Sequence, residues 1–190
     1  VRLLRHWAKH KAWAAVDLET GCAWRDGIDG KTGEKRRIYF SKGVDAYTAM
    51  IFLCSVSVEP GRAVVFDMRT LMKHPEFHSA FQEFLTQCRL VAHNSQFEQS
   101  FFAAHFGITG NVVYDTMIVH QLMTAGRKGG SDLDSMMSRY MGTKLEKEYQ
   151  KLFIRIHPIS PIPDGAIAYS AGDVCQLLAL AQKVDADLRE

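Results

Sequence analysis

The sequence lacks the features that mark several large classes of protein. No stretch approaches the ~18 consecutive apolar residues of a membrane-spanning helix, and the N-terminal segment carries charges where a secretory signal peptide has an apolar core. The cysteines form no C-x-x-C pair and lie at Cys22, Cys54, Cys88 and Cys175. We therefore expect no membrane association, no zinc site, and reduced thiols in a soluble intracellular protein of unknown compartment.

Signatures of common cofactor sites are also missing. The histidines include no H-E-x-x-H pair, and neither of the usual glycine-rich nucleotide-binding loops is present. The net charge is only +2, which gives no general attraction to nucleic acid or membrane. Any basic binding surface must be local, and the two candidates are the cluster at Lys31–Arg37 and the loop at Arg127–Gly130.

The order of strand-like and helical segments predicts an α/β fold. With 190 residues, 47% of them hydrophobic, we expect one domain over 1–190 with a single core. Segment 21–45 is rich in Gly, Asp and Lys and indicates an inserted loop or hairpin. Since the chain starts at Val1 and ends within a helical pattern, it is also compatible with a fragment of a larger protein.

Three strand-like segments, ending near residues 20, 58 and 67, are separated by turn signals and predict an antiparallel meander. Short strands at 89–92 and 112–114 then alternate with helices, which predicts a mixed sheet flanked by helices. The helices are expected at 2–11, from Pro75 through Leu85, and at 95–106, 115–124, 131–141, 144–152 and 164–188.

An acidic pair ends the first apolar run, at Asp17 and Glu19. Successive strand side chains point to opposite faces, so these carboxylates share one face, while Val16 and Leu18 occupy the other. Burying two like charges side by side is costly unless a cation neutralises them. The pair therefore predicts a bound divalent metal or strongly shifted pKa values.

Two further acids are candidates to join this pair. In the last helix, Tyr169 and Asp173 are spaced i, i+4 and share one face; the alternative is an exposed aspartate beside a half-buried tyrosine. Glu98 is expected in the first turn of its helix, and here the alternative is a capping box with Ser95, or a cap made by Asn94.

The remaining acids at helix starts are interpreted as structural. Asp115 precedes a helix and is expected to be its N-cap. Asp132 and Asp134 lie in another first turn, where acids favour the helix dipole.

Taken together, the acids have the composition of a two-metal phosphodiesterase site. Hard carboxylate oxygens are the ligands that Mg²⁺ and Mn²⁺ prefer, and two such cations about 4 Å apart assist in-line displacement at phosphorus. The set is more specific than any of its members.

In these acidic motifs the sequence resembles the DEDD family of 3′–5′ exonucleases. Within that family it resembles the tyrosine-bearing (DEDDy) subgroup, and the branch that contains ribonuclease D and the proofreading domain of DNA polymerase I. The first motif corresponds to Asp17–Thr20, the second to Asn94–Glu98 and the third to Tyr169–Asp173. The resemblance implies a ribonuclease H-like fold and release of 5′-mononucleotides from the 3′ end of single-stranded or frayed DNA or RNA. It also implies either a stand-alone nuclease or a domain linked to or associated with a polymerase.

By this resemblance, Asp17, Glu19 and Asp173 bind one divalent cation, Asp17 and Glu98 contribute to the second, and Tyr169 orients the attacking water. The cations are Mg²⁺ or Mn²⁺. The family's second motif ends in Asp, so Glu98 is a departure that allows normal activity, a preference for Mn²⁺, or weak catalysis with retained nucleic-acid binding.

The resemblance further implies substrate contacts around the first two motifs. The residues expected to touch the substrate are Leu18, Thr20, His93, Asn94, Phe97 and Phe101, each with a packing role as the alternative. Two rival hypotheses remain: a weakly active or inactive nucleic-acid-binding scaffold with the exonuclease fold, and an unrelated globular domain whose acids only cap helices.

Overall fold

The computed structural model describes residues 1–22, 24–39, 43–125, 130–145, 149 and 152–189. The predicted Arg127–Gly130 loop, apart from Gly130, and most of the helical segment predicted at 144–152 lie outside these residues. Within the described part of the chain, no helix is both long and apolar enough to cross a lipid bilayer. All four cysteines have free thiols.

A five-stranded mixed sheet forms the centre of the molecule, with the strand order β5-β4-β1-β6-β7. Its strands are β1 (Trp13–Cys22), β4 (Ala49–Glu59), β5 (Arg62–Asp67), β6 (Arg89–Ala92) and β7 (Val112–Asp115). β1, β4 and β5 pair antiparallel, whereas β6 and β7 continue the sheet in parallel with β1. The predicted meander followed by parallel strands is confirmed, and β1 is the central strand.

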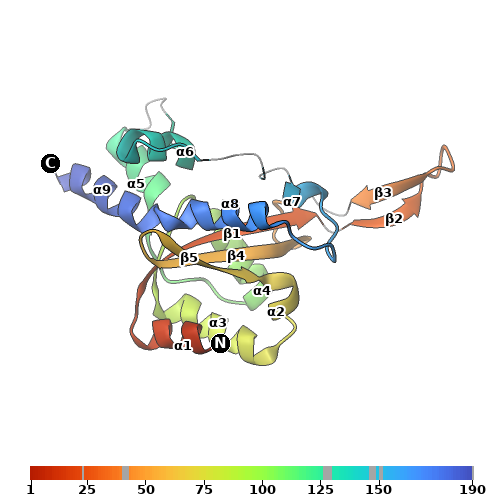
Figure 1. Ribbon diagram of the computed structural model, residues 1–190, viewed down its shortest axis with the longest axis horizontal. Helices are drawn as coiled ribbons and strands as arrows, with labels where there is room; N and C mark the ends of the chain where they lie inside the picture. The colour runs from red at the N-terminus through yellow and green to blue at the C-terminus, as the bar shows by residue number, and fades with distance from the viewer. Residues whose placement is uncertain (23, 40–42, 126–129, 146–148, 150–151, 190) are drawn as a thin grey trace.

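Helices cover both faces of this sheet (Figure 1). The lower face in that view is covered by α1 (Arg2–Lys9), α3 (Pro75–Gln87) and α4 (Gln96–Phe106). The opposite face carries α8 (Asp164–Cys175) and α9 (Leu177–Arg189), with α7 (Leu152–Arg155) near one end. The remaining helical segments are α2 (Met68–Leu71), α5 (Thr116–Met123), α6 (Leu133–Met136) and the π-helical turn Met137–Met141.

Alternation along β1 divides its side chains between two cores. Val16 and Leu18 join an aromatic-rich cluster with Phe81 of α3 and Phe102 of α4. Ala15 faces the other way and packs with α9. This alternation leaves Asp17 and Glu19 on the face that α8 covers.

The long helix predicted at 164–188 is wrong as a continuous element, because it breaks between α8 and α9 at Gln176. The N–H of Gly61, in the turn between β4 and β5, donates to the Cys175 carbonyl oxygen at 2.8 Å. That contact from a distant turn satisfies the carbonyl oxygen of the last residue of α8. Similarly, the helix predicted at 131–141 is divided into α6 and a π-helical turn.

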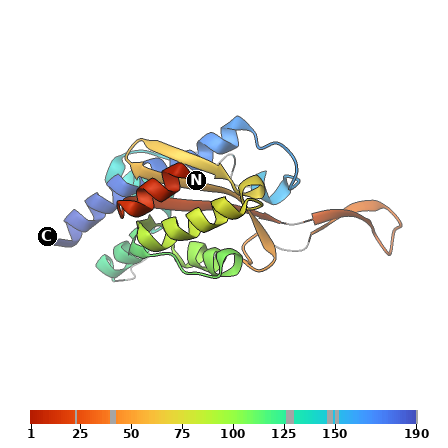
Figure 2. The ribbon, with the colours of Figure 1, turned by 90° about the horizontal axis from the view of Figure 1, so that it is seen from below.

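Within segment 21–45, a separate two-stranded antiparallel sheet is formed by β2 (Trp24–Ile28) and β3 (Lys35–Tyr39). This β2–β3 hairpin projects from the body at the end of β1, as Figure 1 shows. Seen from below, it extends away from the sheet at the end opposite the C-terminus (Figure 2).

Candidate active site

The acidic pair lies on the central strand of the sheet, on the face that α8 covers. Asp17 is directly opposite Ser55 of β4 in the antiparallel register, and Glu19 is opposite Leu53. A register shift follows between Glu19 and Thr20. Glu19 is only 9% exposed, so its carboxylate has little access to water.

A third acid is brought to this pair by α8. Among the residues that the structure describes, Asp17, Glu19 and Asp173 form the one group of three acidic, histidine or cysteine side chains whose ligand atoms all lie within 4.8 Å of one another. Asp173 is separated from the pair by more than 150 residues of chain, so only the fold brings them together. Three carboxylates at this spacing form a compact set of hard oxygen ligands.

Mutual proximity and burial perturb the titration of all three acids. Burial, followed by repulsion from Asp17 and Asp173, raises the pKa of Glu19 to about 9. Burial and the charge of Asp17 raise the pKa of Asp173 to about 7, although a hydrogen bond from Tyr169 opposes the rise. Burial also raises the pKa of Asp17 to about 6. The group is therefore electrostatically unfavourable when fully ionised without a cation.

Tyr169 lies one helical turn before Asp173, as its i, i+4 spacing predicts. Its hydroxyl donates a hydrogen bond to the Asp173 carboxylate, and it is half-buried. Burial, with the nearby charges of Asp173 and Glu19, strongly raises the pKa of the phenol. The side chain is thus a neutral hydroxyl at the edge of the acidic group.

A buried hydroxyl pair fixes α8 against the sheet beside these acids. Ser55 Oγ and Ser170 Oγ lie 2.7 Å apart, and both side chains are completely buried. Ser55 is the cross-strand neighbour of Asp17, and Ser170 stands between Tyr169 and Asp173 along α8. Sequence reasoning missed this contact, because neither serine stands in a motif of its own.

Glu98 lies in the first turn of α4 and is 2% exposed. Burial and the nearby charge of Asp17 raise its pKa well above the ordinary value. It is not part of the 4.8 Å group. Ser95 makes no side-chain cap hydrogen bond, and Glu98 Oε2 is buried without a hydrogen-bond partner. The alternative of a capping box between Ser95 and Glu98 is therefore wrong.

Asp115 shapes the loop that leads into α4. It is the N-cap of α5, as expected, and its Oδ1 accepts the N–H of Met117 at 2.9 Å and of Ile118 at 3.1 Å. The same carboxylate accepts the N–H of Asn94 at 3.2 Å and of Ser95 at 2.6 Å. Burial acts to raise the pKa of Asp115, but these hydrogen bonds outweigh it and lower the pKa.

An open cavity of about 270 Å³ lies over the acidic group. His93 and the segment before and within α6 complete its walls; the residues are Asp17, Leu18, Glu19, His93, Asp132, Leu133, Asp134, Leu145, Tyr169 and Asp173. Asp132, expected in the first turn of this helix, is instead its N-cap, accepting the Ser135 N–H at 3.2 Å. Asp134 instead accepts the N–H of Leu145 at 3.0 Å, which holds that residue at the cavity.

The predicted substrate contacts occupy different environments. His93 lines the cavity, and its Nδ1 lies 2.9 Å from Thr116 Oγ1. Asn94 is exposed with a positive φ of 66°. Thr20 donates from Oγ1 to the Gly43 carbonyl oxygen. Leu18 lines the cavity but is 5% exposed and packs in the core.

The two predicted phenylalanines differ. Phe97 is partly buried, whereas Phe101 is fully buried. The Phe101 ring packs against Phe97 and lies parallel to the His105 ring. Because Phe101 is fully buried, its surroundings match the packing role that is the alternative to a substrate contact.

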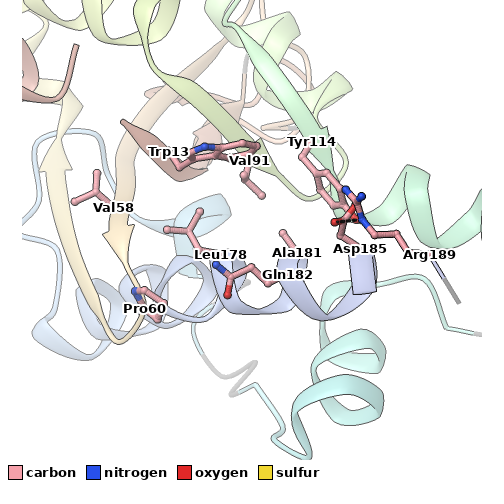
Figure 3. Close-up of a pocket in the computed structure, with 10 residues that line it drawn as sticks. All are labelled: Trp13, Val58, Pro60, Val91, Tyr114, Leu178, Ala181, Gln182, Asp185 and Arg189. Carbon is pink, nitrogen blue, oxygen red and sulfur yellow. Dashed lines mark hydrogen bonds and ion pairs between the residues drawn. The ribbon is translucent and has the colours of Figure 1, made fainter. Parts of the chain in front are cut away.

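A larger cavity of about 570 Å³ lies elsewhere, between α9 and the sheet (Figure 3). Its walls are mostly apolar, with Trp13, Tyr114 and Leu178 among them. Asp185 and Arg189 at its rim form an ion pair of 2.9 Å. This cavity contains none of the clustered carboxylates and is distinct from the candidate site.

The acidic group fits divalent metal. Its oxygens are hard ligands, its pKa values are raised by burial and mutual repulsion that a cation would relieve, and the adjacent Glu98 Oε2 is a buried acceptor without a donor. Asp17, Glu19 and Asp173 would hold one ion, with Glu98 next to Asp17 as the candidate ligand for another.

The sheet order and the helices on both faces define a ribonuclease H-like exonuclease fold. Consistent with this class, the model of the 3′-5′ exonuclease family matches residues 41–189, and the chain belongs to that family. The matched range begins after β1 and the β2–β3 hairpin, so it does not include Asp17 or Glu19. A search of curated protein sequences found no match.

Solved structures share the fold at low sequence identity. Escherichia coli RNase D, an exoribonuclease involved in structured RNA processing, matches with a TM-score of 0.66 and 17% identity over 99% of this chain and 43% of its own. Brucella melitensis NrnC bound to pGG matches with a TM-score of 0.68 and 17% identity over 94% and 74%. Pol1 from M. smegmatis matches with a TM-score of 0.64 and 18% identity over 99% and 26%. The chain thus spans less than half of RNase D and Pol1.

Proposed function

We propose that this chain is a metal-dependent 3′–5′ exonuclease domain that hydrolyses the terminal phosphodiester bond of single-stranded or frayed nucleic acid and releases 5′-mononucleotides. The observation that carries the proposal is the convergence of Asp17, Glu19 and Asp173 within 4.8 Å, in a chain of the exonuclease family. The NrnC relative was solved with bound Mg²⁺ and with pGG, which supports a divalent cation and a nucleotide substrate here.

The residues of the site would have distinct roles in this reaction. Mg²⁺ or Mn²⁺ held by these residues would supply a nucleophilic water and neutralise charge on the phosphate. Asp17, Glu19 and Asp173 hold the cations, and Glu98 adds a carboxylate beside Asp17. Tyr169, neutral because its pKa is raised, donates or accepts a hydrogen bond at the position of the attacking water. With this role for Tyr169, we propose that the chain is a member of the tyrosine-bearing subgroup.

The proposed substrate contacts are Leu18 and His93, which line the cavity, together with Thr20, Asn94 and Phe97. His93 and Asn94 belong to the loop that Asp115 holds, so their backbone position is fixed before substrate arrives. The unit proposed to act is residues 1–190 as one domain, either alone or as part of a polymerase. Exposed nucleobases and frayed ends fit a cavity that is open to solvent rather than enclosed.

The test is a nuclease assay on 5′-labelled DNA and RNA oligonucleotides with a free or a blocked 3′ end, in Mg²⁺ or Mn²⁺. We expect stepwise shortening of free 3′ ends only, loss of at least 1,000-fold in Asp17→Asn, and full activity in Asp187→Asn, which changes an exposed aspartate of α9. Tyr169→Phe should reduce kcat by about 100-fold while metal binding persists. Absence of nucleotide release with either metal, or equal activity in Asp17→Asn, would refute the proposal and favour the inactive-scaffold alternative.

A further inference from the structure

The β2–β3 hairpin is well defined by its contacts, and it has no role in the proposed exonuclease chemistry. Its strands pair over five residues on each side, from Trp24↔Tyr39 to Ile28↔Lys35. At the turn, Asp29 accepts the N–H of Lys31 at 2.8 Å and of Thr32 at 3.2 Å, and it forms an ion pair of 2.8 Å with Arg36. Hydrogen bonds and an ion pair therefore define the hairpin and its turn.

The hairpin concentrates positive charge. Over residues 24–39 it has five basic side chains against three acidic ones, an excess equal to the +2 net charge of the entire chain. Lys31, Lys35 and Arg37 are exposed. Lys35 and Arg37 alternate with Arg36 along β3, so they lie on the same face of the hairpin, and Arg36 on the other. A local excess of exposed cations suits a polyanion.

The hairpin follows directly after the strand that carries the candidate site. β1 carries Asp17 and Glu19 and continues to Cys22, next to the first residues of β2. On the return side, Gly43 accepts the hydrogen bond of Thr20 Oγ1, one residue from Glu19. The hairpin thus begins at the acidic group and projects away from it (Figures 1 and 2). Five strand residues at ~3.3 Å each make the β2–β3 hairpin, which we call the arm, roughly 17 Å long.

From this placement we propose that the β2–β3 hairpin binds the phosphate backbone of the nucleic-acid strand whose 3′ end occupies the acidic site. The inference rests on the proposed exonuclease function and adds a substrate class: strands long enough to extend from the site along the arm. For a strand that keeps the ~3.4 Å axial rise per nucleotide of a duplex, 17 Å corresponds to roughly five phosphates. A dinucleotide is too short to reach the turn at Lys31.

Paired charge variants test the arm. The triple variant Lys31→Gln/Lys35→Gln/Arg37→Gln removes three cations and leaves the Arg36–Asp29 ion pair intact. The matched control, Arg2→Gln/Arg5→Gln/Lys9→Gln, removes three exposed cations from α1, which packs under the sheet away from the hairpin. Both variants change the net charge equally.

Two measurements are made on each protein. The first is fluorescence anisotropy with a 5′-labelled 12-nucleotide single strand in EDTA, at several salt concentrations. The second is kcat/KM in Mg²⁺ for that strand and for a 5′-phosphorylated dinucleotide. We expect the hairpin variant to bind the 12-nucleotide strand at least 10-fold more weakly, with the slope of log K against log salt reduced by about 2, since each phosphate contact to a single strand contributes ~0.7. Its kcat/KM on the dinucleotide should equal the parent's.

The outcomes separate this inference from the proposed function. Unchanged affinity and salt slope in the hairpin variant, an equal loss in the α1 variant, or no measurable binding by the parent would overturn the arm proposal. Weaker binding by the hairpin variant, in a protein that hydrolyses neither substrate, would leave the arm supported and refute the exonuclease proposal alone.

Discussion

Glu19→Gln in the metal-free protein is the most direct test of the electrostatics of the site. Because burial and the neighbouring acids raise the pKa of Glu19 from 4.5 to about 9, the folded chain holds a proton that the unfolded chain releases across that range. A carboxyl whose folded pKa is raised contributes stability that is present below pH 4.5 and is lost as the pH rises toward 9.

Between the two pKa values the unfolded chain has lost the Glu19 proton that the folded chain keeps, so the free energy of unfolding falls by ~1.4 kcal/mol per pH unit. From pH 5 to pH 7, release of this proton in the unfolded chain should therefore lower the free energy of unfolding by about 2–3 kcal/mol. Glutamine has the same shape and stays neutral, so Glu19→Gln should match the parent near pH 4.5 and exceed its stability by about 3 kcal/mol at pH 7. In millimolar Mg²⁺ the order should reverse, because only the parent binds the ion well.

Urea unfolding in EDTA between pH 5 and 8, followed by tryptophan fluorescence, measures the effect. Glu83→Gln, at an exposed position of α3, is the matched control and should leave the pH dependence unchanged. If Glu19→Gln is no more stable than the parent at pH 7 while the control behaves as expected, then burial and the neighbouring acids do not raise the pKa of Glu19. The acidic group would then need no cation to offset burial and repulsion.

Three further variants test the positioning of the site. Asp115→Asn should cost about 2 kcal/mol at pH 7, because an amide cannot satisfy the four N–H donors. The difference should shrink as the pH falls below 3.8, because the unfolded parent then takes up a proton that the folded parent, with its lowered pKa, binds less readily; urea unfolding at pH 3 and 7 checks both points. Ser170→Ala should leave Ser55 without a partner, cost about 1–2 kcal/mol and lower kcat several-fold. The double variant Ser55→Ala/Ser170→Ala should recover most of the stability, and its failure to do so would contradict a role for the pair. Glu98→Gln should lower activity at least 10-fold in both Mg²⁺ and Mn²⁺ by removing the charge beside Asp17, whereas a gain of Mg²⁺ activity in Glu98→Asp would show that the longer side chain detunes the site.

Local sequence patterns predicted the fold well because they report local physics. The apolar run before Asp17 marks the buried central strand, and Pro75 occurs at the first turn of α3. No such signal marks the break at Gln176, where the last residue of α8 accepts a hydrogen bond from Gly61, in a turn more than 110 residues earlier. Phe101 illustrates the converse case: its position in α4, one turn after Glu98, indicated the site, but the aromatic core covers its ring.

Part of the candidate site could likewise be predicted from local spacing, whereas the rest depends on contacts between distant segments. Spacing alone placed Asp17 with Glu19 and Tyr169 with Asp173, because strand and helix periods determine which side chains share a face. How the two pairs meet depends on α8 packing against β4, where Ser55 and Ser170 lie 115 residues apart in sequence. A small displacement of a catalytic group strongly lowers the reaction rate. The hydroxyl pair that positions α8 is therefore as important to the site as the acids that it aligns. A search for related sites should therefore ask for a polar contact between the helix and the strand beside the acidic pair, in addition to the acidic motifs.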